Sequence, residues 1–106
     1  MKIAIGICEK TNGRCSTMGC FRAYNNREKH FSSYKDVDTE LMSFFSCNIC
    51  SSGGIENLSK IAKRLKDSEI HILHLGACAV NCKADKLEEI KKIFTDLGID
   101  VIEGTH

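Results

Sequence analysis

Short apolar runs alternate along the chain with stretches whose apolar residues recur at helical spacing, and this alternation restricts the possible fold most. Four runs rich in Ile, Leu, Phe or Val have the length of buried strands, and they are residues 2–7, 40–46, 70–75 and 99–102. Three stretches between them show helical spacing, weakly in the first case, and they are residues 15–26, 55–65 and 87–97.

Strands that alternate with helices are typical of a parallel sheet covered by helices on both faces. Because crossovers between parallel strands are right-handed, few strand orders remain. We therefore predict an α/β fold with a small four-stranded parallel sheet in the flavodoxin-like or Rossmann-like order 2-1-3-4. We expect residues 1–106 to form a single domain, since the chain contains no linker or repeat. Residues 28–38 are polar, and we expect Phe31 and Tyr34 there to pack outside the main core.

The charge pattern argues against nucleic-acid and membrane partners. The net charge is +1, and Lys and Arg are interspersed with Asp and Glu. No apolar run approaches the length of a membrane helix, and no cleavage site follows the apolar run at the amino terminus. We expect a cytoplasmic protein, and the sequence indicates no surface for a protein partner.

Seven cysteines are unusual for a chain of 106 residues. Cytoplasmic thiols stay reduced, so this number indicates metal or redox chemistry rather than a set of disulfides. A chain of this length can bury a core without metal or disulfides. Bound metal would therefore serve function.

Three cysteines follow the predicted strands. Cys8 comes directly after the first strand, Cys47 after the second, and Cys78 shortly after the third, while the fourth strand leads to His106. Carboxyl ends of parallel strands share one edge, where open α/β folds bind their ligands. Neighbouring strands are about 4.8 Å apart, so we expect these groups to converge.

Cys47 and Cys50 form a Cys-x-x-Cys pair before a predicted helix. This spacing allows both sulfurs to bind one tetrahedral metal, and the helix dipole favours their thiolate forms. Further candidate ligands lie near the same edge, and they are Cys15, Cys20, Cys82, His74 and His106. A single cysteine is often an apolar filler, a chain-terminal histidine often frays, and His74 can equally be a core histidine satisfied by the backbone.

The order of these motifs resembles the CGGC domain family, small bacterial and archaeal proteins named for a central Cys-Gly-Gly-Cys. The resemblance covers nearly the whole chain, and its motifs are Cys8, Cys15, Gly19-Cys20-Phe21, Cys47-Asn48-Ile49-Cys50, His74-Leu75, Cys78 and Glu103-Gly104-Thr105-His106. It implies metal binding, usually suggested to be of zinc. Asn48 and Ile49 replace the two central glycines, and β-branched Ile49 cannot adopt a positive φ cheaply. The central turn is therefore expected to differ.

We predict a metal-binding protein with a site made from Cys8, Cys47, Cys50 and Cys78. A single closed zinc site needs only four ligands, and seven thiols exceed that number, so the bound group can be Zn²⁺, an iron–sulfur cluster or a two-metal site. A metal carrier or sensor is one form of this function. The alternative is a thiol–disulfide redox protein in which one of Cys47 and Cys50 attacks and the other resolves. The absence of proline weakens it, since thioredoxin-like proteins place a cis-proline opposite their thiols. Whether the chain is an enzyme stays open.

Overall fold

A computed structural model describes residues 1–8, 15–47, 53–82 and 84–105, with backbone alone for residues 77, 81, 82 and 84. Four parallel strands form one sheet in the order β2-β1-β3-β4, as predicted. The strands are β1 (Lys2–Ile7), β2 (Glu40–Ser46), β3 (Ile72–Leu75) and β4 (Asp100–Glu103). The first two have the predicted bounds, whereas β3 begins two residues later and β4 is displaced by one residue.

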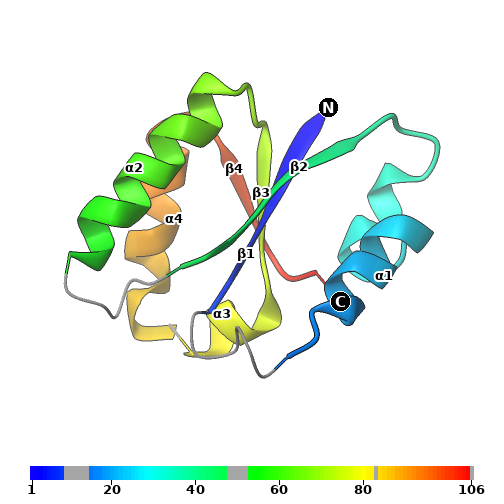
Figure 1. The fold of residues 1–106 in the computed structure, drawn as a ribbon, viewed down its shortest axis with the longest axis horizontal. Helices are drawn as coiled ribbons and strands as arrows, with labels where there is room; N and C mark the ends of the chain where they lie inside the picture. Colours follow the sequence, from blue (N-terminus) through cyan, green and yellow to red (C-terminus); the bar gives the residue numbers. More distant parts are fainter. Residues whose placement is uncertain (9–14, 48–52, 83, 106) are drawn as a thin grey trace.

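Helices cover both faces of the sheet (Figure 1). The α-helices are α1 (Met18–Asn26), α2 (Gly54–Asp67), α3 (Ala77–Cys82) and α4 (Leu87–Thr95), and the 3₁₀ helices are η1 (Lys29–Tyr34) and η2 (Ala84–Lys86). Helices α2 and α4 lie on one face and α1 on the other, while α3 lies at the carboxyl end of the strands. Helix α3 was not predicted because six residues are too few to show a helical period.

Two apolar cores lie on opposite faces of the sheet. The α2/α4 core consists of the buried residues Ala4, Cys47, Leu58, Ala62, Leu65, Ile70, Leu73, Leu75, Ile90, Phe94 and Ile99. The α1 core consists of the buried residues Ile3, Ile5, Ile7, Cys20, Ala23, Phe31 and Tyr34. Successive β1 side chains enter opposite cores, as expected for a central strand covered on both faces.

Phe31 and Tyr34 are core residues, which corrects the expectation that they pack outside the main core. Their exposed fractions are 0% and 4%. Side chains three residues apart eclipse one another in a 3₁₀ helix, so η1 directs both rings toward the sheet. The three-residue spacing of the two rings fits a 3₁₀ helix, but two apolar positions in a polar stretch are too few to predict one.

A register shift on edge strand β2 sets the face to which its later side chains point. Ile3 pairs with Leu41, but Ala4 pairs with Ser43, so Met42 is an extra residue. A shift of one residue exchanges the two faces of a strand. The extra residue therefore directs the end of β2, including Cys47, toward the α2/α4 core.

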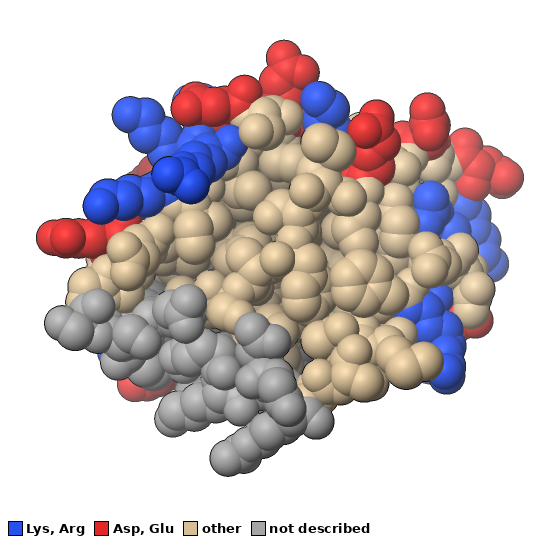
Figure 2. Space-filling view, in the orientation of Figure 1, with Lys and Arg blue, Asp and Glu red and all other residues tan. Residues whose placement is uncertain are grey.

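Charged side chains of both signs lie along the top and the two sides of the face in Figure 2, and uncharged side chains occupy its centre. This distribution agrees with the net charge of +1. Among the described residues, no helix combines the length and apolarity that crossing a membrane requires.

Candidate metal centre at the carboxyl edge

Cys8 and Cys47 directly follow two neighbouring strands of the sheet. Ile7 pairs with Ser46, and the Cys47 N–H donates to the Ile7 carbonyl at 2.7 Å. The exposed fractions of Cys8 and Cys47 are 0% and 1%. Cys47 belongs to the α2/α4 core, and the alternation along β1 that directs Ala4 there predicts the same side for Cys8.

Cys78 lies beyond the end of β3, on helix α3. The Gly76 N–H donates to the Gly6 carbonyl at 2.8 Å, which continues the pairing of β1 and β3. A Cβ atom on Gly76 would lie 3.4 Å from Cys78 Sγ and 3.5 Å from Ile7 Cγ2. The Cys78 sulfur therefore lies beside Gly76, just beyond the end of β3, where it is partly exposed and packs against the α1 core.

Cys15 and Cys20 belong to the α1 side of the edge. Cys15 is exposed just before α1, and its sulfur accepts the Thr17 N–H at 3.3 Å. Cys20 is buried, and its sulfur is 3.2 Å from Thr105 Oγ1. Burial raises the pKa of the Cys20 thiol; the hydrogen bond to Thr105 opposes this, and nearby Cys78 and Cys15 raise the pKa further. Cys20 is therefore a neutral thiol near pH 7.

His74 has a protein partner at each ring nitrogen. Its Nδ1 is 3.0 Å from the Gly104 carbonyl, and its Nε2 is 2.7 Å from the Tyr34 hydroxyl. A carbonyl only accepts, so Nδ1 carries the proton and Nε2 accepts the Tyr34 O–H. Burial lowers the pKa of His74; the Gly104 bond opposes this shift, and His30 adds to it. Burial also raises the pKa of Tyr34.

The other described histidines are exposed. His71 accepts the Lys2 N–H at 3.5 Å through Nδ1. The His30 ring lies against Gly104, where an added Cβ would overlap it. Neither histidine contacts a described cysteine through a hydrogen bond that the structure shows.

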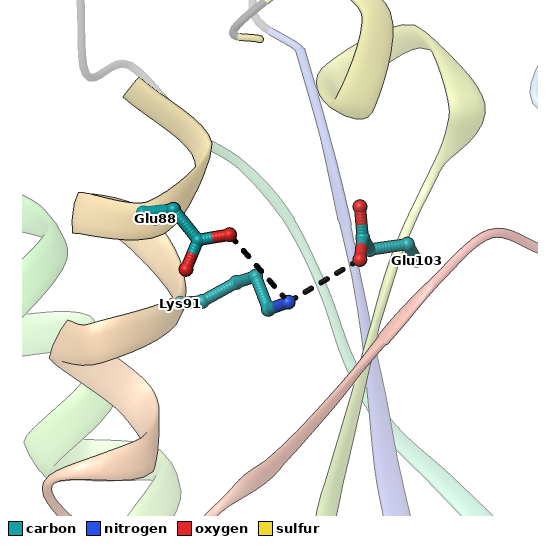
Figure 3. Close-up of polar contacts among 3 residues, drawn as sticks. All are labelled: Glu88, Lys91 and Glu103. Carbon is teal, nitrogen blue, oxygen red and sulfur yellow. Dashed lines mark hydrogen bonds and ion pairs between the residues drawn. The ribbon is translucent and has the colours of Figure 1, made fainter. Parts of the chain in front are cut away.

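Lys91 bridges two carboxylates near the end of β4, a contact that sequence reasoning did not find (Figure 3). Its Nζ is 3.2 Å from Glu103 Oε2 and 4.0 Å from Glu88 Oε1. The pairing balances the charge of Glu103 and connects α4 to β4.

The sequence also did not predict three partners of site residues, which are Tyr34, Gly104 and Thr105. The available signal for η1 was the three-residue spacing of Phe31 and Tyr34.

The predicted ligand set is only partly within the described residues. No group of three or more His, Cys, Asp or Glu side chains in that part of the chain is arranged to hold a metal ion. Cys50, His106 and the side chain of Cys82 lie outside it. The four-cysteine site therefore stays a prediction.

The fold and its strand-end thiols define an α/β protein with cysteines at the carboxyl edge of a parallel sheet. The family model of the CGGC domain matches residues 2–106, and the chain belongs to this family. An uncharacterized protein of Methanocaldococcus jannaschii is 33% identical over 113 aligned residues, which cover 100% of this chain and 87% of that relative. No solved structure matches the chain. Metal binding is attributed to CGGC domains as a family, with no particular metal specified.

Proposed function

We propose that this protein binds a thiophilic metal, as Zn²⁺ or an iron–sulfur cluster, through Cys8, Cys47, Cys50 and Cys78. The observation that carries the proposal is the arrangement around the end of β1. Cys8 and Cys47 follow paired strands at the same level, and the Cys78 sulfur lies beside Gly76 at the end of β3, the other neighbour of β1. Thiolates are the preferred ligands of both metal forms.

Burial makes a cation necessary if these two thiols are to act as thiolates. Cys8 and Cys47 are almost fully buried, and two thiolates there would be costly without a compensating cation. A bound metal supplies this charge and keeps its thiol ligands deprotonated. The described residues do not complete a site by themselves, and a tetrahedral site needs four ligands. Cys50, three residues after Cys47, is the ligand that the Cys-x-x-Cys spacing adds.

Elemental analysis and absorption spectroscopy of anaerobically purified protein test the proposal. We expect one zinc ion per chain with no visible colour, or iron and sulfide with thiolate-to-iron absorption. Cys8→Ser and Cys47→Ser should each reduce metal affinity by at least about tenfold, because each removes one of the four proposed thiolate ligands. Cys15→Ser is the matched control and should retain the metal, since Cys15 is exposed before α1. Unchanged metal content in both the Cys8 and Cys47 variants would overturn the proposal.

A redox function is the competing outcome of the same experiments. Cys47 is 1% exposed within the α2/α4 core, which hinders its attack on the disulfide of another protein. A Cys50→Ser variant distinguishes the two functions. Loss of metal without a trapped mixed disulfide supports the metal site. Full metal content together with a mixed disulfide on Cys47 would replace the metal site with a thiol–disulfide exchange centre.

A further inference from the structure

We propose that Cys20 and His74 are positioning residues that hold the tail residues Gly104 and Thr105 against the α1 side of the thiol edge, and that neither is a metal ligand. We call this arrangement the tail anchor, and it consists of Cys20, Tyr34, His74, Gly104 and Thr105. The inference rests on the proposed function, because it assigns roles to two candidate ligands of the same site.

His74 is already fully engaged. Its Nδ1–H donates to the Gly104 carbonyl, and its only lone pair in the ring plane, on Nε2, accepts from Tyr34. The Phe31 ring lies with its centroid 4.4 Å from that of the imidazole, and His74 is 0% exposed. Coordination of a metal would require His74 to give up Tyr34 or Gly104 within an apolar environment. The two hydrogen bonds instead fix the direction in which the chain leaves β4.

Cys20 holds the next residue of the tail. Its sulfur is 3.2 Å from Thr105 Oγ1, and both residues are buried, at 5% and 0% exposed. Removing the thiol would leave the buried Thr105 hydroxyl without the partner that the structure gives it, which is costly.

The tail anchor connects α1 to the sheet. Beyond Glu103 the described tail, drawn in red, runs from β4 to the side of α1 (Figure 1). The bond between Cys20 and Thr105 links residues 85 positions apart in the sequence. Because Cys78 packs against the same α1 core, the position of α1 affects the thiol edge. Loosening the anchor should therefore weaken metal binding without removing a ligand.

Hydrogen exchange in metal-free protein tests the anchor independently of metal. The Gly104 N–H donates to the Ile102 carbonyl at 3.2 Å and reports the order of the tail. Thr105→Val and Cys20→Ala each delete one side of the hydrogen bond and should accelerate Gly104 exchange by about tenfold. Cys20→Ser retains a hydroxyl and should restore slow exchange. The anchor would be overturned if the Gly104 N–H exchanged in all three variants at the same rate as in the unmodified protein.

Cobalt binding separates the positioning role from a ligand role. With Co²⁺ as probe, we expect Thr105→Val and Cys20→Ala to weaken affinity about tenfold while the thiolate-to-cobalt absorption at saturation keeps its intensity. Cys20→Ser should bind as tightly as the unmodified protein. Reduced absorption in both Cys20 variants, with Thr105→Val unaffected, would make Cys20 a ligand and overturn the inference.

Histidine variants provide a second, matched pair. His74→Asn keeps an amide donor toward Gly104 but loses the bond to Tyr34, whereas His71→Asn changes an exposed histidine three residues earlier. We expect faster Gly104 exchange and weaker Co²⁺ binding only in His74→Asn, with unchanged absorption at saturation. A change in the cobalt d–d bands, which report the kind and number of ligands, would instead identify His74 as a ligand. Failure of the unmodified protein to bind Co²⁺ or Zn²⁺ would overturn the proposed function and leave the exchange result for the anchor intact.

Discussion

Gly104 shows how a single backbone angle supports the tail. Its φ of +137° lies in a region that L side chains rarely adopt, and an added Cβ would overlap the His30 ring. The residue must therefore be glycine for Gly104 to present its carbonyl to His74.

Gly104→Ala should lower the free energy of unfolding by about 1–3 kcal/mol, through backbone strain and displacement of His30. Gly98→Ala is the matched control, because Gly98 has a φ of +81° and open space around its Cβ position. It should cost only about 1 kcal/mol. Urea denaturation of both variants measures the difference, and equal losses would contradict a specific role for the contact with His30.

His74 should make stability depend on pH. Burial holds its pKa in the folded protein below the ordinary value of 6.5, so the unfolded chain takes up the proton first as the pH falls. The contribution of neutral His74 is complete above about pH 6.5 and declines below it, until the folded protein also binds the proton.

Urea denaturation between pH 8 and pH 5 measures this dependence. The free energy of unfolding should fall less steeply below pH 6.5 in His74→Asn than in the unmodified protein. His71→Asn should retain the steeper dependence, since that histidine is exposed. The same slope in all three proteins would mean that His74 does not carry the effect.

The 3₁₀ helix η1 contributes to the core beyond what its length indicates. It places Phe31 at 0% exposure against Tyr24, Tyr34 and the His74 ring. A six-residue element in a polar stretch thus supplies the largest side chains of the α1 core.

Phe31→Ala should lower the free energy of unfolding by about 3–5 kcal/mol, because a fully buried ring leaves a cavity. Phe21→Ala is the comparison: this ring is 37% exposed, with its centroid 5.1 Å from that of Phe44. We expect it to cost well under half as much, since less apolar surface returns to water. Similar losses in denaturant titrations of the two variants would show that η1 is not part of the cooperative core.

Some helices and strands could be predicted from the sequence, and others could not. Strands β1 and β2 are the two longest strands and contain clear apolar runs, and their ends were predicted without error. Elements η1 and α3 span six residues each, which is too short for a period to appear. The strand-end positions of Cys8 and Cys47 follow from topology, since any parallel sheet collects its carboxyl ends at one edge. The partners of His74 do not, because Tyr34 and Gly104 lie 40 and 30 residues away and meet it only after folding.

At the scale of the whole molecule, the two cores share the central strands. β1 sends Ala4 into the α2/α4 core and Ile3 and Ile5 into the α1 core. If either core lost its packing, the face of β1 that it covers would be exposed to water, and the strand that supports the other core would lose its cover on that side. We therefore propose that residues 1–106 are one domain that unfolds as a unit, and backbone circular dichroism and tyrosine fluorescence should give coincident transitions.

Zinc should stabilise that unit as a whole. The proposed ligands follow β1 and β2 and lie on α3, so metal bound only to the folded state adds a free energy of RT ln(1 + [L]/Kd), or about 2.7 kcal/mol at a hundredfold excess over Kd. The midpoint of thermal unfolding should rise with the concentration of free Zn²⁺. The rise should be the same whether unfolding is followed by circular dichroism or by tyrosine fluorescence. Cys47→Ser should abolish the shift, whereas Cys15→Ser should keep it. A shift confined to tyrosine fluorescence, which reports Tyr24 and Tyr34 on the α1 side, would place the metal away from the strand ends. Equal shifts that disappear in Cys47→Ser would show that metal bound through Cys47 stabilises the whole cooperative unit.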